Sequence, residues 1–478
     1  MNYRMITYIL GWILIFEAMF MAVPAITAVC FGESAVWWFL ATAAVCVAIG
    51  LPLTKIKKPQ NKKLYSREGF VIVSLSWIVL SVFGCLPFFL SGEIPSFIDA
   101  LFETVSGFST TGATILDDVE VLSKSMLMWR SFTHWVGGMG VLVFIMAFVQ
   151  LSGAQNMHIM KAESPGPSVS KLVPRVRTTA ILLYGIYFAL TLVEFIFLLF
   201  GGLTPFDALN TAFSTAGTGG FGIYNDSIAS FSVYDQIIII VFMLLFSVNF
   251  NSYFFLLKGK FREALSLEVK VFFGIVVTSV LIIAFNIMES LSGFGRALLD
   301  SSFSVASVIS TTGFSTVDFD LWPELSKTIL VLLMFVGACA GSTGGGMKVS
   351  RVIILFKNLG RELLGMIHPN QVKKIKIDGH PVEDETVHSV SVYIIAYLAV
   401  VMVSIGIISF DNYDFITNFT AVVSSLNNIG PGLELVGPTA NFGFFSIPSK
   451  LVLIFDMLAG RLELFPMLLL FNPAMWKK

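Results

Sequence analysis

Long apolar runs recur along the chain and constrain its fold more than any other feature. Runs with few charged residues lie at 5–28, 36–52, 70–90, 127–151, 179–200, 236–257, 271–288, 330–340, 389–410 and 451–471. Most of them approach the roughly 20 residues with which a helix crosses a bilayer. Only 13% of all residues are charged, about half of what a soluble domain carries. The sequence therefore predicts an all-α polytopic membrane protein embedded in the lipid bilayer.

Basic residues gather in some of the loops between these runs. Lysines and arginines cluster at 55–67, 161–177, 258–270 and 348–376, and two lysines end the chain. The positive-inside rule places such stretches in the cytoplasm. Because two apolar runs precede the first basic loop, the N-terminus is expected on the same side. The prediction is a multi-pass protein of the cytoplasmic (inner) membrane with both termini in the cytoplasm.

The first long outward loop is acidic. Between residues 92 and 123 it has no basic residue and holds the carboxylates Glu93, Asp99, Glu103, Asp117, Asp118 and Glu120. A negative outer mouth favours a cation as the approaching solute. No nucleic acid partner is expected.

A short polar phrase recurs in four predicted outward loops. They read FIDALFETVSGFSTTGAT, FDALNTAFSTAGTGGFG, LLDSSFSVASVISTTGFST and FITNFTAVVSSLNNIGPG, and their matching glycines are Gly112, Gly220, Gly313 and Gly430. An aspartate precedes the first three glycines by thirteen residues, and Thr417 takes that place in the fourth loop. A serine also keeps the register: Ser106, Ser214, Ser307 and Ser424. Close helix packing explains one such run, but four in register make packing alone improbable.

Each of these segments is too short to cross a bilayer and too apolar for an exposed loop. Apolar residues near helical spacing in the first segment indicate a short re-entrant helix that ends in an extended polar run. We therefore predict four helix–pore-loop–helix repeats around a pseudo-fourfold pore, plus an N-terminal helix pair. The N-terminal pair and its basic loop occupy 1–66, and the pore repeats occupy 67–150, 151–258, 259–380 and 381–478.

The polar runs suit a dehydrated cation. A cation that sheds its water needs replacement oxygens, which rings of backbone carbonyls supply, and glycine permits the extended backbone that turns them inward. The candidate ion-binding residues are Thr110, Thr111 and Gly112; Thr218, Gly219 and Gly220; Thr311, Thr312 and Gly313; and Asn428, Ile429 and Gly430.

The third inner helix is interrupted by glycines between residues 337 and 346. Each costs a regular helix up to about 1 kcal/mol relative to alanine. A phosphate-binding loop does not fit, because Met347 separates Gly346 from Lys348. The stretch is either a flexible kink or a mobile plug under the filter. The gating candidates in this stretch are Gly341, Ser342, Thr343, Gly344, Gly345, Gly346 and Lys348, and Arg461 is the eighth candidate.

Arg461 is the second anomaly, because it lies inside an apolar run. An arginine at the centre of a membrane helix costs roughly 2.5–3.5 kcal/mol on insertion scales, so it should face protein or water and have a partner. Asp456 and Glu463 are the nearest acids in sequence. A structural ion pair and direct control of the pore both fit. His134 has no second ligand nearby and is expected to pack rather than bind metal.

The runs STTGAT, GTGGFG, STTGF and NNIGPG resemble the filter segments of the Trk/Ktr/HKT superfamily of cation transport subunits. The resemblance extends from about Phe70 onward, and the additional N-terminal helix pair resembles the TrkH branch. It implies potassium (K⁺) as the transported ion, no organic cofactor in this chain, a homodimer, and a cytoplasmic TrkA-type nucleotide-binding regulatory subunit. In the plant branch a serine at the first filter glycine accompanies sodium preference, so Gly112 indicates potassium. The glycine-rich stretch resembles the family's intramembrane gating loop, and Arg461 an arginine near the constriction beneath the filter.

Three classes of function remain to be compared. The first is gated potassium uptake through a carbonyl-lined filter. The second is a secondary transporter that couples K⁺ to H⁺ or Na⁺, which would need an intramembrane carboxylate; Glu194 and Asp456 are the candidates. An enzyme is disfavoured, because the sequence shows no His/Asp or His/Glu metal spacing and no nucleophile motif with a base nearby.

Overall fold

The computed structural model describes residues 1–56, 65–140, 176–291, 293–369 and 374–476. The described chain is mostly helical, and its strands β1 (Lys376–Ile377) and β2 (His380–Pro381) form a small hairpin. The predicted all-α membrane fold is confirmed. Several predicted features lie partly or wholly outside the described residues: the basic loops at 55–67, 161–177 and 348–376, the two lysines that end the chain, and the end of the apolar run at 127–151.

An N-terminal pair of helices packs beside the rest of the bundle. Helices α1 (Tyr3–Phe20) and α2 (Ala22–Phe31) form one apolar stretch, and α3 (Val36–Ile56) returns beside α1. Two glycines allow the close approach, since a β-carbon at Gly50 would lie 2.8 Å from the carbonyl oxygen of Gly11.

The remaining helices repeat one order of elements four times. The outer helices are α4 (Ser66–Gly84) with its continuation α5 (Leu86–Ser91), α10 (Val176–Phe200), α15 (Leu267–Ile287) and α19 (Asp384–Ile408). The short half-helices are α6 (Phe97–Phe108), α11 (Pro205–Gly217), α16 (Phe294–Ile309) and α20 (Phe415–Asn427). The inner helices are α7 (Lys124–Gly138), α12 (Val233–Ser247), α17 (Glu324–Val336) and α21 (Ile447–Arg461).

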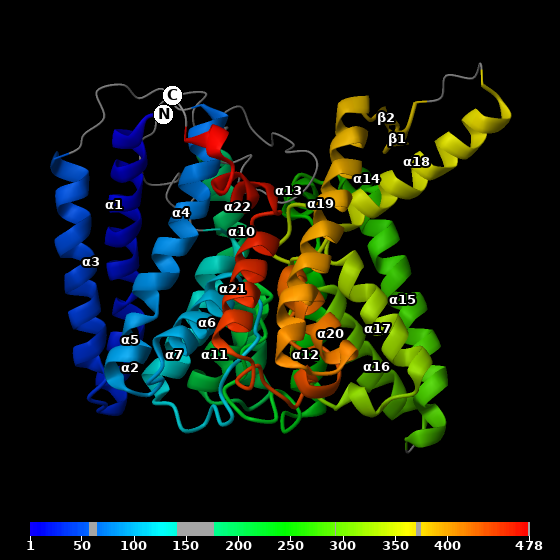
Figure 1. The fold of residues 1–478 in the computed structure, drawn as a ribbon. Coiled ribbons are helices and arrows are strands. Elements are labelled where there is room, and N and C mark those ends of the chain that lie inside the picture. The colour runs from blue at the N-terminus through cyan, green and yellow to red at the C-terminus, as the bar shows by residue number, and fades with distance from the viewer. Residues whose placement is uncertain (57–64, 141–175, 292, 370–373, 477–478) are drawn as a thin grey trace.

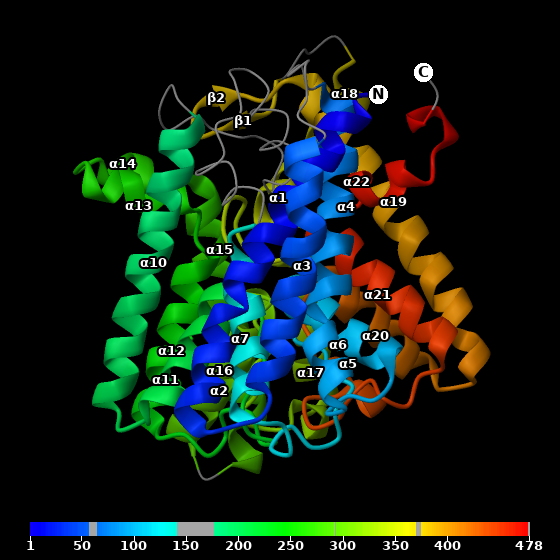
Figure 2. The ribbon, with the colours of Figure 1, turned by 90° about the vertical axis from the view of Figure 1, so that its left-hand side faces the viewer.

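Further helices follow three of the inner helices. These are α13 (Phe250–Leu257), α14 (Phe261–Ala264), α18 (Val349–Ile367) and α22 (Phe465–Leu470). The 3₁₀ turns are η1 (Met288–Ser290), η2 (Phe319–Leu321), η3 (Ser409–Asp411), η4 (Glu434–Val436) and η5 (Pro473–Met475). Figures 1 and 2 show both termini at one end of the bundle and the half-helices α6, α11, α16 and α20 in the opposite half.

Six helical segments among the described residues are long and apolar enough to cross a membrane. They are Tyr3–Phe31, Val36–Lys55, Ser66–Ser91, Ala180–Phe200, Leu267–Ser290 and Asp384–Asp411. These segments include the N-terminal helices and all four outer helices. The half-helices are too short for this role, as the sequence predicted.

The inner helices are interrupted more often than expected. The sequence predicted a break only in the third, where α17 ends at Val336. The apolar run at 236–257 is also broken, because α12 and α13 meet at 93°. Asn249 causes the second helix to restart there, since its side chain caps α13 by accepting the N–H of Asn251 at 2.9 Å. The run at 451–471 breaks as well, at Glu463 and Leu464, both of which have positive φ.

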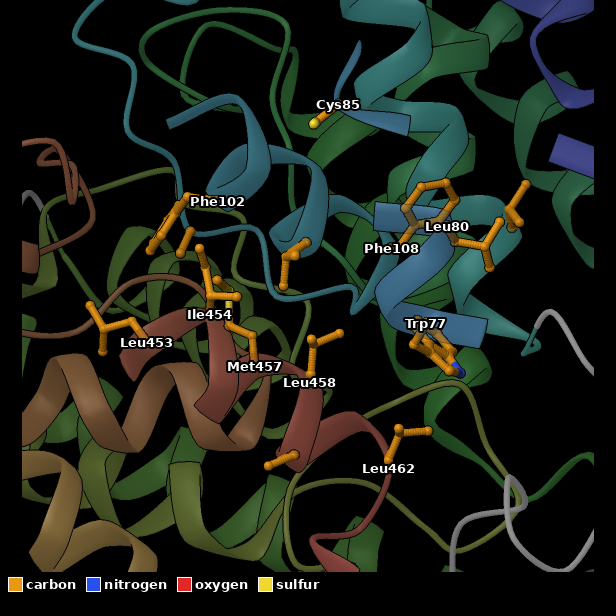
Figure 3. Close-up of a cluster of buried hydrophobic side chains, with 14 of the residues drawn as sticks. Trp77, Leu80, Cys85, Phe102, Phe108, Leu453, Ile454, Met457, Leu458 and Leu462 are labelled. Atoms are coloured by element: carbon orange, nitrogen blue, oxygen red, sulfur yellow. The ribbon is translucent and has the colours of Figure 1, made fainter. Parts of the chain in front are cut away.

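The largest apolar core joins the first repeat to the fourth. Figure 3 shows Phe102 of α6 beside Ile454 and Met457 of α21, with Trp77 of α4 and Phe108 of α6 in the same cluster. All five residues are buried, and all but Ile454 are almost inaccessible to solvent. Repeats at opposite ends of the sequence therefore pack directly against each other, as a closed ring of repeats requires.

Candidate functional site

The four half-helices end in the same backbone turn. Each turn holds one non-glycine residue with φ between 55° and 59°: Thr110, Thr218, Thr311 and Asn428. The next residue donates its N–H to the serine carbonyl five positions earlier at 2.9–3.0 Å, in the pairs Thr111–Ser106, Gly219–Ser214, Thr312–Ser307 and Ile429–Ser424. This is the long hydrogen bond of a Schellman cap, and it explains the register of the serines. Left-handed threonine is uncommon and costs energy, so the surrounding structure must hold these turns.

The matching glycines place the four turns around a common centre. All four have φ between 79° and 102°, a region that glycine enters without penalty. A β-carbon would meet a backbone oxygen at each position: 2.0 Å for Gly112 to Gly219, 1.9 Å for Gly220 to Thr312, 1.9 Å for Gly313 to Ile429 and 2.8 Å for Gly430 to Thr111. Each glycine therefore faces a carbonyl of the following unit, and the fourth unit faces the first. We call residues 110–112, 218–220, 311–313 and 428–430 the loop ring.

One cavity opens onto the loop ring from the side of the loops that follow the half-helices. Its volume is about 180 Å³, and Gly112, Gly220, Gly313 and Gly430 all line it. The structure thus brings together the twelve candidate ion-binding residues, in the cyclic order of their units. Fourfold symmetry is imperfect, since Gly219 and Asn428 have no counterparts of the same type in the other units.

Serine hydroxyls bind the chain at the ring glycine or just after it in three of the units. Ser214 donates to the carbonyl of Phe221 at 3.0 Å, Ser307 to that of Phe314 at 2.6 Å, and Ser424 to that of Gly430 at 2.6 Å. In the first unit a carboxylate binds this part of the loop, because Glu103 accepts the N–H of Ile115 at 3.1 Å and the hydroxyl of Thr114 at 3.0 Å. The sequence register of the serines did not reveal this difference.

The glycine-rich loop between α17 and α18, residues 337–348, lies against the inner side of the loop ring. The N–H of Gly345 donates to the hydroxyl oxygen of Thr311 at 2.6 Å. Two residues earlier in the loop, the Thr343 hydroxyl donates to the carbonyl of Phe246, at the end of α12, at 3.1 Å. The carbonyl of Gly341 accepts the N–H of Phe250 at 3.0 Å. The loop therefore occupies the space between the ring and the break in the second inner helix.

A second cavity, of about 90 Å³, lies on this inner side. Its walls include most of the gating candidates: Gly341, Ser342, Gly344, Gly345, Gly346, Lys348 and Arg461. Lys348 is buried, and its ammonium group donates to the carbonyl of Gly344 within the same loop. The eight gating candidates, Thr343 included, therefore come together beneath the ring.

Arg461 binds backbone oxygens of two different units. Its guanidinium donates to the carbonyl of Thr343 at 2.7 Å, and to those of Gly137 and Gly138 at 2.6 Å each. These oxygens belong to the glycine-rich loop and to the end of α7. Arg461 thus connects the loop to the first inner helix, and its positive charge faces the cavity beneath the ring.

Each of the two acids nearest to Arg461 in the sequence has a further partner. Asp456 accepts a hydrogen bond from Ser404 at 2.8 Å, and Glu463 forms an ion pair with Arg351. Carbonyl oxygens at helix ends and in the loop were missed as partners, because sequence proximity cannot show which backbone oxygens lack a helical donor.

The acidic loop at 92–123 is less negative than its sequence suggested. Glu103 is buried and forms an ion pair with Arg130 over 2.7 Å. Asp99 pairs with Lys450 of the fourth repeat over 2.6 Å. Two of the carboxylates are therefore neutralised by basic residues that come from outside the loop.

Another of these carboxylates remains at the surface and links two loops. Asp118 accepts a hydrogen bond from the amide of Asn225 at 2.8 Å. This hydrogen bond, with one from the N–H of Glu120, lowers the pKa of Asp118 below its ordinary value. Asp118 therefore stays ionised in mildly acidic solution.

His134 does more than pack. It is fully buried on α7, with Nδ1 2.7 Å from the carbonyl oxygen of Gly107 and Nε2 accepting the N–H of Phe221 at 3.2 Å. These contacts require a proton on Nδ1 and a free lone pair on Nε2. His134 therefore bridges the half-helix of the first unit and the loop of the second. A lone histidine in the sequence gave no signal for this role.

Among the described residues, three carboxylates in the long or inner helices have no exposed surface. Glu194 lies in α10 and Asp456 in α21, as the coupled-transport alternative required. Glu17 of α1 was not among the candidates; it lies beside α4, where a β-carbon at Gly84 would be 3.1 Å from its Oε1.

Similarity to known proteins extends over the whole chain. A family model described as "TrkH: Cation transport protein" matches residues 38–478. The Trk system potassium uptake protein TrkH of Salmonella typhimurium is 37% identical, over 100% of both chains. The Trk system potassium uptake protein TrkG of Escherichia coli is 31% identical, over 99% of both chains.

A solved structure has the same fold. The crystal structure of the potassium transporter TrkH from Vibrio parahaemolyticus superimposes with a TM-score of 0.90. The two chains are 33% identical, and the match covers 100% of each. The helical arrangement described above is therefore the arrangement of that transporter.

Proposed function

This chain belongs to the TrkH family of cation transport proteins, and on that premise we propose that it takes up potassium through the loop ring under control of the glycine-rich loop. Its relatives are named as potassium uptake proteins, and the chain is a transport protein rather than an enzyme. The ion crosses the cytoplasmic membrane at a filter formed by the candidate residues of all four units.

The observation that carries this proposal is the closed order of glycines and carbonyls. Each glycine of the ring faces a backbone oxygen of the neighbouring unit, and all four line one cavity. Rings of backbone carbonyls can replace the water of a K⁺ ion. The carboxyl ends of the four half-helices lie beside the ring and add partial negative charge there. Gly112 supports potassium as the preferred ion.

The glycine-rich loop is proposed as the gate. It contacts Thr311 on one side and the broken second inner helix on the other, so ions leaving the ring would meet it directly. Arg461 holds the loop to the end of α7 and places positive charge under the ring. Release of these contacts would open the path, and a deletion of residues 341–346 is expected to raise ion flux.

Orientation and partners follow the same proposal. Both termini lie at the end of the bundle away from the half-helices, which supports a cytoplasmic location for both. We further propose a homodimer whose gate responds to a cytoplasmic TrkA-type nucleotide-binding subunit. The partner subunit, and not this chain, determines which nucleotide acts on the gate.

The test measures ion selectivity in cells that lack their own potassium uptake systems. Expression of the chain should restore growth at low potassium, and Gly112→Ser or Gly313→Ser should reduce the preference for potassium over sodium. Selectivity that is unchanged in both variants would contradict the proposed filter.

Coupled transport of K⁺ with H⁺ or Na⁺ remains the alternative, because Glu194 and Asp456 are buried in membrane helices. Proteoliposomes decide between the two. Passive, reversible rubidium flux without a pH or sodium gradient favours the gated filter, whereas flux that needs such a gradient favours coupling.

A further inference from the structure

A buried ion pair lies directly beside the loop ring, in the first unit alone among the four matched positions. Glu103 of α6 and Arg130 of α7 are joined by two contacts, from Nη2 at 2.7 Å and from Nε at 2.8 Å to the same carboxylate oxygen. Both side chains are almost completely inaccessible, at 0% and 2% exposure. The matching residues of the other units are Thr211, Ser304 and Ala421.

Each partner of the pair binds a different ring loop. Glu103 accepts hydrogen bonds from Thr114 and from the N–H of Ile115, immediately after the ring residues of the first unit. Arg130 donates from Nη1 to the carbonyl of Gly222 at 3.1 Å, immediately after the ring residues of the second unit. The ion pair therefore connects the first loop to the second through these three hydrogen bonds and the charge pair itself.

Further contacts of α7 reinforce this connection. The guanidinium of Arg130 stacks over the ring of Phe221, with its central carbon 4.0 Å from the ring centroid. One turn later, His134 accepts the N–H of Phe221 and lies 2.7 Å from the carbonyl oxygen of Gly107. The junction between the first and second loops is thus fixed by side chains of one helix.

The charge of Arg130 has a second consequence, because Arg130 also lines the cavity outside the ring. A cation that approaches the ring passes this guanidinium. The carboxylate of Glu103 lies in contact with the guanidinium of Arg130. Because the two charges are opposite and so close together, their electric fields nearly cancel at the pore. Without Glu103, the mouth would carry an uncompensated positive charge in a poorly solvated place.

We propose that the Glu103–Arg130 pair is a positioning and specificity-determining element of the filter. It fixes the spacing between the first and second ring loops, and it keeps the outer mouth free of net positive charge. Both roles rest on the proposed function, since they concern cation passage through the ring. The ion pair makes the junction between the first and second loops rigid. The residues that match Glu103 in the other three units are uncharged and form no such pair.

Three variants separate the roles of charge and geometry. Glu103→Gln keeps the size of the side chain but leaves Arg130 uncompensated, so the KM for rubidium uptake should rise about tenfold. Glu103→Gln combined with Arg130→Gln removes both charges and should return the KM to within about threefold of the parent. Arg130→Lys keeps the charge but loses the planar fork, so the KM should change little while the preference for potassium over sodium falls.

Purified protein supplies the folding control for each variant. The quantity of monodisperse protein and its melting temperature are measured beside rubidium uptake and the potassium-to-sodium ratio. A merely structural pair would lower the quantity of folded protein and leave KM and ion preference unchanged in the molecules that fold. Arg296→Gln is the matched control, because it breaks an ion pair with Asp300 on α16 away from the ring. It should change neither the KM for rubidium nor the ion preference.

The outcomes distinguish this proposal from the proposed function. A parent chain that restores no potassium uptake overturns the function and with it the basis of the pair's role. A parent that transports while Glu103→Gln and Arg130→Lys keep the parental KM and ion preference overturns the pair's role alone. Where Glu103→Gln does not fold, Arg130→Lys decides, and an unchanged potassium-to-sodium ratio in that variant overturns the proposal.

Discussion

The side-chain amide of Asn428 donates a hydrogen bond to the hydroxyl oxygen of Thr111 over 3.0 Å, although 317 positions separate the two residues. The same amide donates to the carbonyl of Met457 in α21 at 2.8 Å. Asn428 thus ties the last loop of the ring to the first and to its own inner helix. Asparagine also tolerates the left-handed backbone that this position requires.

Asn428→Gly tests the hydrogen bonds without disturbing the backbone, because glycine accepts a φ of 55°. Loss of the buried amide should lower the free energy of unfolding by about 1–3 kcal/mol and reduce the preference for potassium over sodium. Thermal unfolding in detergent and ion uptake measure the two effects. Asn412→Gly is the control, since Asn412 has a similar φ of 61° at the surface; equal effects at both sites would contradict the tie.

Gly112→Ala should abolish selective uptake. The substitution combines an unfavourable φ of 79° with a β-carbon 2.0 Å from the carbonyl oxygen of Gly219, so the ring oxygens of the second unit must move. Gly92→Ala isolates the backbone cost, since Gly92 has a φ of 80° and nothing within 4 Å of its β-carbon position. That control should cost about 1–2 kcal/mol of stability and leave ion preference intact. Similar selectivity in both variants would show that the ring tolerates displacement of this oxygen.

Much of this arrangement could be predicted from the sequence, because the period of the repeat carries information that single residues do not. Apolar runs of membrane length predicted the outer helices. The common offset of Ser106 and Gly112 in each unit predicted four matching re-entrant segments, and the structure gives the reason for the offset: the serine carbonyl caps the half-helix just before the ring. The shared spacing can be recognised even though the residues between the serine and the glycine differ from unit to unit.

The contacts that join different units could not be predicted in the same way. Arg461 binds carbonyl oxygens that every residue possesses, so no sequence pattern marks them. Glu103 was assigned to an acidic outer surface, yet it is buried against Arg130. The break between α12 and α13 was also missed, because the apolar run continues through Val248 and Asn249 provides only a local capping signal.

Asp118 offers a prediction for pH. The hydrogen bond from Asn225 lowers the pKa of Asp118, so the contact between these outer loops is fully present above the ordinary value of 3.8 and is lost only as the pH falls through the lower, folded value. An NMR titration of carboxyl-labelled aspartate should place the midpoint of Asp118 below 3.8. Asn225→Ala should move that midpoint upward; equal midpoints in the two proteins would refute the assigned cause.

Glu194→Gln and Asp456→Asn test whether transport needs a titrating group in the membrane. If ions pass through the ring without coupling, both variants should retain rubidium exchange across proteoliposomes that have no pH or sodium gradient. Asp456→Asn should change stability little, because the amide oxygen of asparagine can accept the hydrogen bond that Ser404 donates to Asp456 at 2.8 Å, and the variant should still exchange rubidium. A variant that folds normally but loses proton- or sodium-driven accumulation seen in the parent would support coupling instead.

Arg461→Gln should raise the basal flux of ions. The guanidinium binds the glycine-rich loop at Thr343 and Gly137 at the end of α7. Hydrogen bonds from a charged donor contribute about 1.5–3 kcal/mol each. Their loss should therefore favour release of the loop. Rubidium efflux from proteoliposomes is expected to rise about tenfold, since each 1.4 kcal/mol corresponds to one such factor. Arg461→Lys separates two causes: it keeps the positive charge but cannot bind both segments as a fork. High flux in the lysine variant indicates that the tether closes the path, and low flux indicates that the charge does; lower flux in a well-folded glutamine variant would exclude both.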